Sequence, residues 1–346
     1  MTVTAGRAAP VLPGAHGIRF LELELTAFCQ LTCVHCLTSS SPQASHGRLG
    51  LADWLSVTSQ AAGLGIGMVQ LIGGEPLTSP HAAPLIEHAG DLGLRVEVFS
   101  NLYSVTSRMW RLLARDGVSL ATSVYSDHPG EHDQVTGKPG SFARNRANLR
   151  KALSLGIPVR CGIVEVLPGQ RSAQARADLE ALGITSIKTD RVRAVGRAAA
   201  GPGDPDVSEL CGRCGLGRAG VLPDGSLVPC VLGRFLPAGN VTTSSLAALL
   251  ASPAWRDVMG RIPRPAGACP PAASDDCNPA STPACSPAFR GWTGSPAPGR
   301  SPARSPTRSP GGAIRSPRRP ATSSCRAGGR TAPGSCATAP PVPRHG

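Results

Sequence analysis

The sequence predicts an α/β fold, a partial (β/α)6 TIM-type barrel followed by a small cysteine-rich module and a disordered tail. Strand-like and helix-like segments alternate over residues 18–190, which is typical of a parallel sheet covered by helices. Cysteines recur in turn-rich sequence over residues 191–290, which predicts a metal-dependent module with few core residues. Over residues 291–346 serine, proline, arginine and glycine dominate, and such a composition cannot bury enough surface to fold. Residues 1–17 precede the first predicted strand as an N-terminal extension.

Six segments of residues 18–190 have the apolar pattern of strands, and we expect helices between them. The predicted strands lie at 18–25, 66–74, 94–100, 118–125, 157–166 and 184–190. The predicted helices lie at 51–64, 83–93, 106–116, 141–155 and 171–182, and the second begins near Pro84 because proline suits a first turn. Six units are too few for a closed eight-stranded barrel. In an open barrel of this type the chemistry lies beyond the C-terminal ends of the strands.

The charge distribution argues against a nucleic-acid partner. The formal net charge is +13, but ten arginines follow Asp276, the last acidic residue, and subtracting them leaves +3 for the rest. Aromatic residues make up only 3%, so few side chains could stack on bases. No apolar run is long enough to span a bilayer, and the first seventeen residues lack the features of a signal peptide. We therefore expect a cytoplasmic protein without a membrane partner.

Three of the twelve cysteines lie close together directly after the first predicted strand. The stretch TAFCQLTCVHCL (26–37) contains Cys29, Cys33 and Cys36 in the spacing C-x3-C-x2-C. In the cytosol, cysteines serve metal binding or redox chemistry more often than disulfides. Three thiolates on one loop can hold three corners of a cubane iron–sulfur cluster and leave the fourth iron open to a small molecule. Zinc would require a fourth ligand, and His35 would compete with its neighbours for space. Buried or zinc-bound cysteines remain the alternative.

A second motif, LIGGEP (71–76), ends the next predicted strand. Gly73 and Gly74 have no side chains, so a ligand can approach their backbone closely. Glu75 offers a carboxylate to a cationic amine. The alternative is an ordinary glycine turn.

Together the two motifs resemble the signature of the radical S-adenosylmethionine (SAM) enzymes. The resemblance implies a [4Fe–4S] cluster on the three cysteines, with SAM on the open iron, a radical formed from SAM, and an external electron donor of the flavodoxin or ferredoxin type. It also implies that the SAM amino group is contacted by Gly73, Gly74, Glu75 and Pro76. At later strand ends, Asn101 and Ser123 are expected to bind the ribose and carboxylate of SAM. The alternative is that each is a structural polar side chain whose hydrogen bonds are made within the protein. Cys161 is expected to be a packing residue.

The C-terminal cysteines resemble the opening of the SPASM extension, which carries auxiliary iron–sulfur clusters in enzymes that modify peptides. The segment 211–230 supplies the first part of the pattern, and GNV (239–241) with a following helix that contains SPAWRDVMGRI supplies the next. The later cysteines are evenly spaced and depart from the usual pattern, so one auxiliary cluster is expected rather than two. Its candidate ligands are Cys211, Cys214, Cys230, Cys269, Cys277 and Cys285. A zinc knuckle is the alternative.

The resemblance predicts a radical SAM enzyme that acts on a peptide or protein, in the maturation of a ribosomally made precursor. The segment HDQVTGKPGSF (132–142) resembles a loop common in peptide-modifying members. Radical chemistry on a small-molecule cofactor precursor and a non-catalytic metal-binding protein are the alternatives. The abrupt Ser-Pro-Arg composition from about residue 287 predicts a frameshift product or a disordered appendage, which resequencing of the locus would test.

Overall fold

The computed structural model of the chain describes residues 17–199, 201 and 203–263, which all belong to one compact unit, Met1–Thr293. The predicted tail (291–346), almost all of the N-terminal extension, and Cys269, Cys277 and Cys285 lie outside the described residues.

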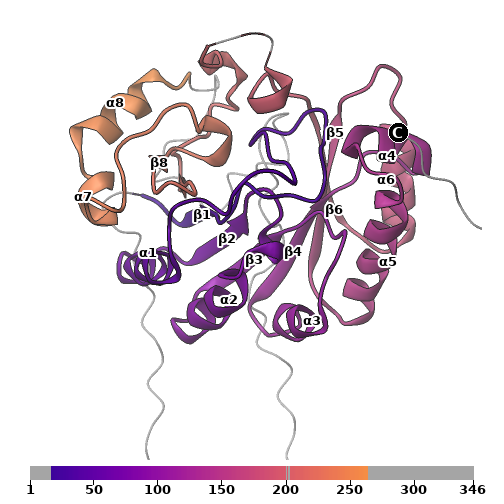
Figure 1. Ribbon diagram of the computed structural model, residues 1–346, viewed down its shortest axis with the longest axis horizontal. Helices are drawn as coiled ribbons and strands as arrows, with labels where there is room; N and C mark the ends of the chain where they lie inside the picture. The colour runs from indigo at the N-terminus through magenta and orange to yellow at the C-terminus, as the bar shows by residue number, and fades with distance from the viewer. Residues whose placement is uncertain (1–16, 200, 202, 264–346) are drawn as a thin grey trace, which may run out of the picture. The chain divides into compact units, whose positions relative to one another are not determined.

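All six predicted strands are present, and they pair in parallel in chain order (Figure 1). Their bounds are β1 (Phe20–Glu24), β2 (Met68–Ile72), β3 (Arg95–Phe99), β4 (Val118–Ser123), β5 (Val159–Glu165) and β6 (Ser186–Arg191). The parallel order and the intervening helices confirm the expected α/β fold with an open barrel.

All five predicted helices are present, and the structure adds one more within this part of the chain. The bounds are α1 (Leu51–Gly63), α2 (Ala82–Asp91), α3 (Ser107–Leu113), α4 (Pro129–Thr136), α5 (Ser141–Ser154) and α6 (Ser172–Ala181). Helix α2 begins before Pro84, which lies in its first turn.

Helix α4 corrects the expectation of a loop over 132–142. Pro129 stands in its first turn, and Gly137 ends it in a left-handed conformation with φ of +65°. The Asp133 carboxylate then accepts hydrogen bonds from the backbone N–H groups of Gly140 (2.6 Å) and Phe142 (2.8 Å). The predicted loop is therefore only the short turn between α4 and α5.

The two faces of the parallel sheet differ in chemistry, as β1 shows. Leu21 and Leu23 are fully buried on the face that packs against helices, where Trp54 of α1 is also fully buried. Glu22 and Glu24 alternate with these leucines and so point to the opposite face, where they line a cavity. The sheet is thus apolar outside and partly charged inside.

The cysteine-rich region joins the same sheet. Strand β7 (Arg218–Val221) pairs in parallel with β1, with Phe20 opposite Arg218, and β8 (Leu227–Val228) pairs antiparallel with β7. Neither strand was predicted, because both are short. Helix α7 (Leu246–Leu250) follows, and α8 (Pro253–Arg261) confirms the helix expected after GNV.

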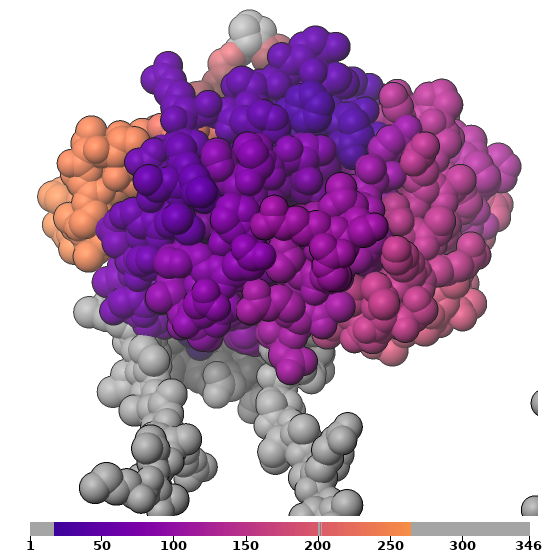
Figure 2. Space-filling model, turned by 60° about the horizontal axis from the view of Figure 1, so that its bottom comes forward, coloured from indigo at the N-terminus to yellow at the C-terminus, as the bar shows by residue number. Residues whose placement is uncertain are grey.

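Figure 2 brings the helical side of the described chain forward, with the segments of α7 and α8 in orange at one edge. Among the described residues, no helix has the length and apolar character needed to cross a membrane.

Candidate active site

A cavity of about 280 Å³ opens at the carboxyl ends of the parallel strands. Its wall includes the loop after β1, the ends of β2 to β6, and part of the cysteine-rich region. This is the position at which barrels of this type carry their chemistry. Seven predicted site residues of the core converge there: Cys29, Cys33, Cys36, Gly73, Gly74, Asn101 and Ser123.

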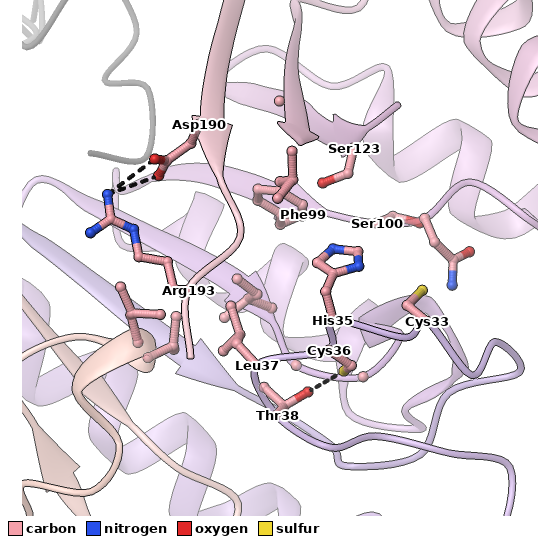
Figure 3. Close-up of a pocket in the computed structure, with 18 of the residues that line it drawn as sticks. Cys33, His35, Cys36, Leu37, Thr38, Phe99, Ser100, Ser123, Asp190 and Arg193 are labelled. Atoms are coloured by element: carbon pink, nitrogen blue, oxygen red, sulfur yellow. Dashed lines mark hydrogen bonds and ion pairs between the residues drawn. The ribbon is translucent and has the colours of Figure 1, made fainter. Parts of the chain in front are cut away.

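The loop of three cysteines is fixed by backbone hydrogen bonds at its start and in its middle. Cys29 N–H donates to the Ser41 carbonyl (3.1 Å), and Thr32 N–H donates to the Thr136 carbonyl at the end of α4 (3.1 Å). The three cysteines are free thiols that line the cavity. Figure 3 shows His35 between the loop and the strand ends that carry Phe99 and Ser123.

The surroundings of the three sulfur atoms suit thiolate ligands. The Asn101 side-chain amide donates to Cys29 Sγ (3.5 Å), and Thr38 Oγ1 lies 3.2 Å from Cys36 Sγ. Burial raises the pKa of Cys29 and of Cys33 to about 12, so metal binding would be needed to ionise these thiols at neutral pH.

Three cysteine thiols on one wall form the donor set of an iron–sulfur cluster with one open iron. The described residues contain no group of three or more Cys, His, Asp or Glu side chains placed to hold a single metal ion. A [4Fe–4S] cluster makes a different demand, because each cysteine binds its own iron. The residues therefore fit the cluster.

Gly73 and Gly74 line the cavity and also allow β2 to pack against the cysteine loop. Gly74 N–H donates to the Thr26 carbonyl (2.7 Å), which continues the β1–β2 pairing into the loop. A Cβ on Gly73 would lie 2.5 Å from the Thr26 carbonyl oxygen, and one on Gly74 would overlap the Phe28 carbonyl. Larger residues at either position would therefore push the loop away from β2.

The structure places Glu75 and Pro76 behind the cavity wall. Glu75 is fully buried, and its carboxylate accepts hydrogen bonds from Leu77 N–H (3.0 Å), the Ser100 hydroxyl (2.8 Å) and Asn101 N–H (2.8 Å). Burial raises the pKa of Glu75 to about 7. The carboxylate holds the loop after β3, and through it Asn101, while its expected contact with the SAM amino group stays a prediction.

The described C-terminal cysteines cluster next to the same cavity. The sulfur atoms of Cys214 and Cys230 lie 2.8 Å apart, and hydrogen bonds with Cys211 and Cys230 raise the pKa of Cys214. Cys211 and Cys230 line the cavity together with the three-cysteine loop. Cys161, by contrast, is fully buried in the core, as expected of a packing residue.

Arg197 was not predicted as a site residue, yet it binds the backbone of the cysteine loop. The backbone N–H of Arg197 donates to the Cys36 carbonyl (2.8 Å), and its guanidinium donates to the carbonyls of Cys33 and Ser40. Gly196 makes this approach possible, because a Cβ there would overlap the Leu37 carbonyl. Nothing in one Gly-Arg pair of a turn-rich segment could have indicated this contact.

We expect Arg197→Gln to loosen the cysteine loop and to speed the loss of iron from the reconstituted protein. Charge-assisted hydrogen bonds contribute about 1.5–3 kcal/mol each, so release of iron to a chelator should become about tenfold faster or more. Arg191→Gln is the matched control, since that guanidinium binds Glu209 (2.8 Å) and not the loop. Equal rates of iron release from the two variants would contradict the role of Arg197.

Two buried carboxylates of β1 were also missed, because alternating glutamates in a strand normally indicate a solvent-facing side. Glu22 Oε1 lies 3.4 Å from Arg218 Nη1, and its Oε2 accepts from Val231 N–H (2.7 Å). Glu24 Oε2 accepts from Arg234 Nη1 (2.9 Å), and burial raises the pKa of Glu24 to about 7. Both side chains line the cavity.

A row of rings closes one side of the cavity. Tyr125 packs against His35 and His132, with ring centroids 5.0 and 5.3 Å apart, and His132 packs against Phe142. Tyr125 N–H lies 3.4 Å from His132 Nδ1. Burial lowers the pKa of both histidines to about 4, so they are neutral at pH 7.

We expect the neutral state of His132 to make stability fall as pH drops. The unfolded chain binds a proton below about pH 6.5, whereas the folded chain does so only near pH 4, so protons favour unfolding in this window. The loss approaches about 3 kcal/mol for this histidine at the acid end. Urea unfolding at pH 7.5 and pH 5 should show a smaller decline in His132→Phe than in the wild type. Identical declines would contradict the assignment.

Comparison with known protein families identifies two regions of the chain. The radical SAM superfamily matches residues 23–182, and the iron–sulfur cluster-binding domain named SPASM matches residues 211–278. The first match runs from the end of β1 through α6, with the three-cysteine loop, and the second includes Cys211, Cys214 and Cys230.

The names of two curated relatives state different functions. An AdoMet-dependent heme synthase of Methanosarcina barkeri is 35% identical over 138 residues, which cover 39% of this chain and 40% of the relative. A PqqA peptide cyclase of Ruegeria pomeroyi is 32% identical over 166 residues, which cover 46% of this chain and 43% of the relative. The chain thus spans less than half the length of these relatives.

Among solved structures, SuiB of Streptococcus suis bound to its precursor peptide SuiA has a similar fold. The TM-score is 0.59 at 13% sequence identity, and the match covers 72% of this chain and 67% of that one. At this identity the likeness concerns the fold.

Proposed function

Since the chain belongs to the radical SAM superfamily and carries a SPASM domain, we propose that it is an enzyme that reductively cleaves SAM and modifies a peptide or protein. We infer that the substrate is a ribosomally made precursor. The electron donor would be a protein of the flavodoxin or ferredoxin type, and the place of action the cytoplasm.

One observation carries this proposal. A single cavity is lined both by the three-cysteine loop, through Cys29, Cys33 and Cys36, and by the SPASM region, through Cys211 and Cys230. A substrate that enters this cavity would lie between the two iron–sulfur sites. When bound, the [4Fe–4S] cluster and SAM supply a 5′-deoxyadenosyl radical that removes hydrogen from a substrate.

The residues of this chain hold and shape the site. The cluster would be held by Cys29, Cys33 and Cys36, and the Asn101 amide donates a hydrogen bond to the first of these sulfurs. Gly73 and Gly74 line the side of the cavity assigned to the SAM amino group, while Asn101 and Ser123 are assigned to its other polar groups. We assign Glu75 and Pro76 a supporting role, because neither lines the cavity.

We assign residues 18–190 to the radical core and residues 191–290 to an auxiliary-cluster module. The described cysteines Cys211, Cys214 and Cys230 would supply ligands to one auxiliary cluster, and Cys269, Cys277 and Cys285 are the further candidates. Pairing of β7 with β1 joins the module to the core sheet, so the auxiliary site would have a fixed position relative to the first cluster.

The peptide class is supported by the comparisons. The names of the PqqA peptide cyclases and of the SuiB complex both refer to a peptide. The heme synthase, whose identity to this chain is 35%, favours a second candidate, a small-molecule cofactor precursor.

The test uses anaerobically reconstituted protein with SAM and dithionite. Peptides encoded next to the gene and porphyrin precursors are supplied separately, and 5′-deoxyadenosine and the mass of each substrate are followed. A mass change in a peptide supports the proposal, whereas a change in a porphyrin alone supports the second candidate. Absence of 5′-deoxyadenosine from a preparation loaded with iron would show a non-catalytic metal protein.

A further inference from the structure

Glu24 stands at the end of β1, at the boundary between the radical core and the SPASM region. In the sheet, β1 lies between β2 and β7. Glu24 is fully buried. It lines the cavity together with Val231 and Leu232 of the SPASM region. Its charge is balanced from that region as well, because Arg234 Nη1 donates to Oε2 at 2.9 Å.

The other oxygen of this carboxylate has no partner. Glu24 Oε1 is buried and makes no hydrogen bond with any described residue. Glu22, two residues earlier on the same face, differs in that Arg218 and Val231 N–H occupy both of its oxygens. Leaving a buried carboxylate oxygen without a donor is costly, so this atom is a free acceptor for a donor from a molecule in the cavity.

A second buried atom without a partner belongs to a residue that lines the same cavity, and it is a hydrogen-bond donor instead of an acceptor. Arg160 binds Glu97 through Nε and Nη2 (both 2.6 Å), while its Nη1 makes no hydrogen bond with a described residue. Glu24 Oε1 and Arg160 Nη1 are thus a free acceptor and a free donor in cavity-lining residues, where His35 Nδ1 and Arg193 Nε also lack a partner among the described residues. A peptide chain carries one N–H donor and one carbonyl acceptor in each residue other than proline.

We propose that Glu24 Oε1 binds an N–H group of the peptide substrate. This subsite rests on the proposed function and adds a specificity-determining residue to it. Arg234 already neutralises the Glu24 carboxylate, so a neutral amide N–H can enter without leaving a net charge in the cavity.

SAM offers another N–H group that could reach this oxygen. Glu24 Cγ lies 3.3 Å from where a Cβ of Gly73 would stand, so the carboxylate is close to the strand end assigned to the SAM amino group. The two sources of N–H make different predictions. A contact to SAM would weaken SAM binding in a variant, whereas a contact to the substrate would weaken peptide binding and leave SAM binding intact.

The experiment measures both affinities on the full reconstituted chain. SAM binding is measured by equilibrium dialysis, and binding of a fluorescein-labelled precursor peptide, the one that the wild type modifies, by anisotropy with SAM present. Glu24→Gln keeps the size of the side chain but removes its charge and turns an amide N–H₂ toward the cavity or toward Arg234. Glu165→Gln is the control, because it removes a carboxylate charge from an exposed residue at the end of β5 that does not line the cavity.

We expect Glu24→Gln to bind the peptide about 10-fold to 100-fold more weakly than the wild type, the range for a hydrogen bond to a charged group. SAM affinity should stay within about threefold, and Glu165→Gln should keep the affinity for the peptide. Should Glu24→Gln fail to retain iron, Glu24→Asp serves instead, since it keeps the charge and draws the oxygen back by one methylene.

Unchanged peptide affinity in both Glu24 variants would overturn the subsite and leave the proposed function standing. Weaker SAM binding with unchanged peptide affinity would also overturn it, and would assign the oxygen to SAM. If the wild type cleaves SAM but binds and modifies no peptide, the peptide function itself is wrong, and the subsite falls with it.

Discussion

Replacing Cys29, Cys33 and Cys36 together by alanine should abolish the formation of 5′-deoxyadenosine from SAM and dithionite. The three thiols are the ligand set of the loop, and they line one cavity. Without them neither the cluster nor the open iron that would hold SAM can form. The product is measured by chromatography after anaerobic reconstitution, and we expect a fall to the background of the protein-free reaction.

Two further measurements make this result specific. Cys161→Ala removes a thiol that is fully buried in the core, and it should leave 5′-deoxyadenosine formation within about twofold of the wild type, because it creates only a small cavity. The triple variant should retain the iron that belongs to the SPASM region. Product from the triple variant above background would mean that the loop is not where SAM is cleaved.

The strands and helices of the core could be predicted because each has its own local pattern. Apolar runs ended by glycines, such as the one before Gly73, indicate buried strands, and all six proved correct. The three-cysteine spacing likewise predicted the loop that lines the cavity. Strands β7 and β8 were missed because segments of four and two residues are too short for a periodic pattern.

The roles of individual polar side chains were harder to predict, because they depend on contacts between distant segments. Arg197 binds carbonyls more than 150 residues earlier in the chain, and its own neighbourhood has no motif. Glu24 looks like one of two alternating strand glutamates until Arg234 pairs with it and Val231 and Leu232 join it at the cavity. Such residues become visible only when the sheet order is known.

Glu75 makes structural contacts that its motif did not predict. The motif GGEP correctly located the strand end, but a sequence cannot give the direction of a side chain. The structure turns the Glu75 carboxylate away from the cavity, into three donors from the segments after β2 and β3. It therefore supports the loop that carries Asn101.

We expect Glu75→Ala to lower the free energy of unfolding by about 3 kcal/mol or more, because it leaves Leu77 N–H, the Ser100 hydroxyl and Asn101 N–H buried without an acceptor. Urea unfolding of the protein before reconstitution measures this loss. Release of Asn101 should also remove the hydrogen bond to Cys29 Sγ and reduce the iron that the variant retains.

Glu165→Ala is the control for this change, since Glu165 is an exposed carboxylate at the end of β5 and should cost less than about 0.5 kcal/mol. If Glu75 acted only as a partner of the SAM amino group, Glu75→Ala would unfold like the wild type and lose affinity for SAM alone. A loss of stability before any cofactor is added therefore separates the two roles. In this fold the carboxylate of the motif holds the ligand-bearing loop in shape, and the glycines beside it provide the space.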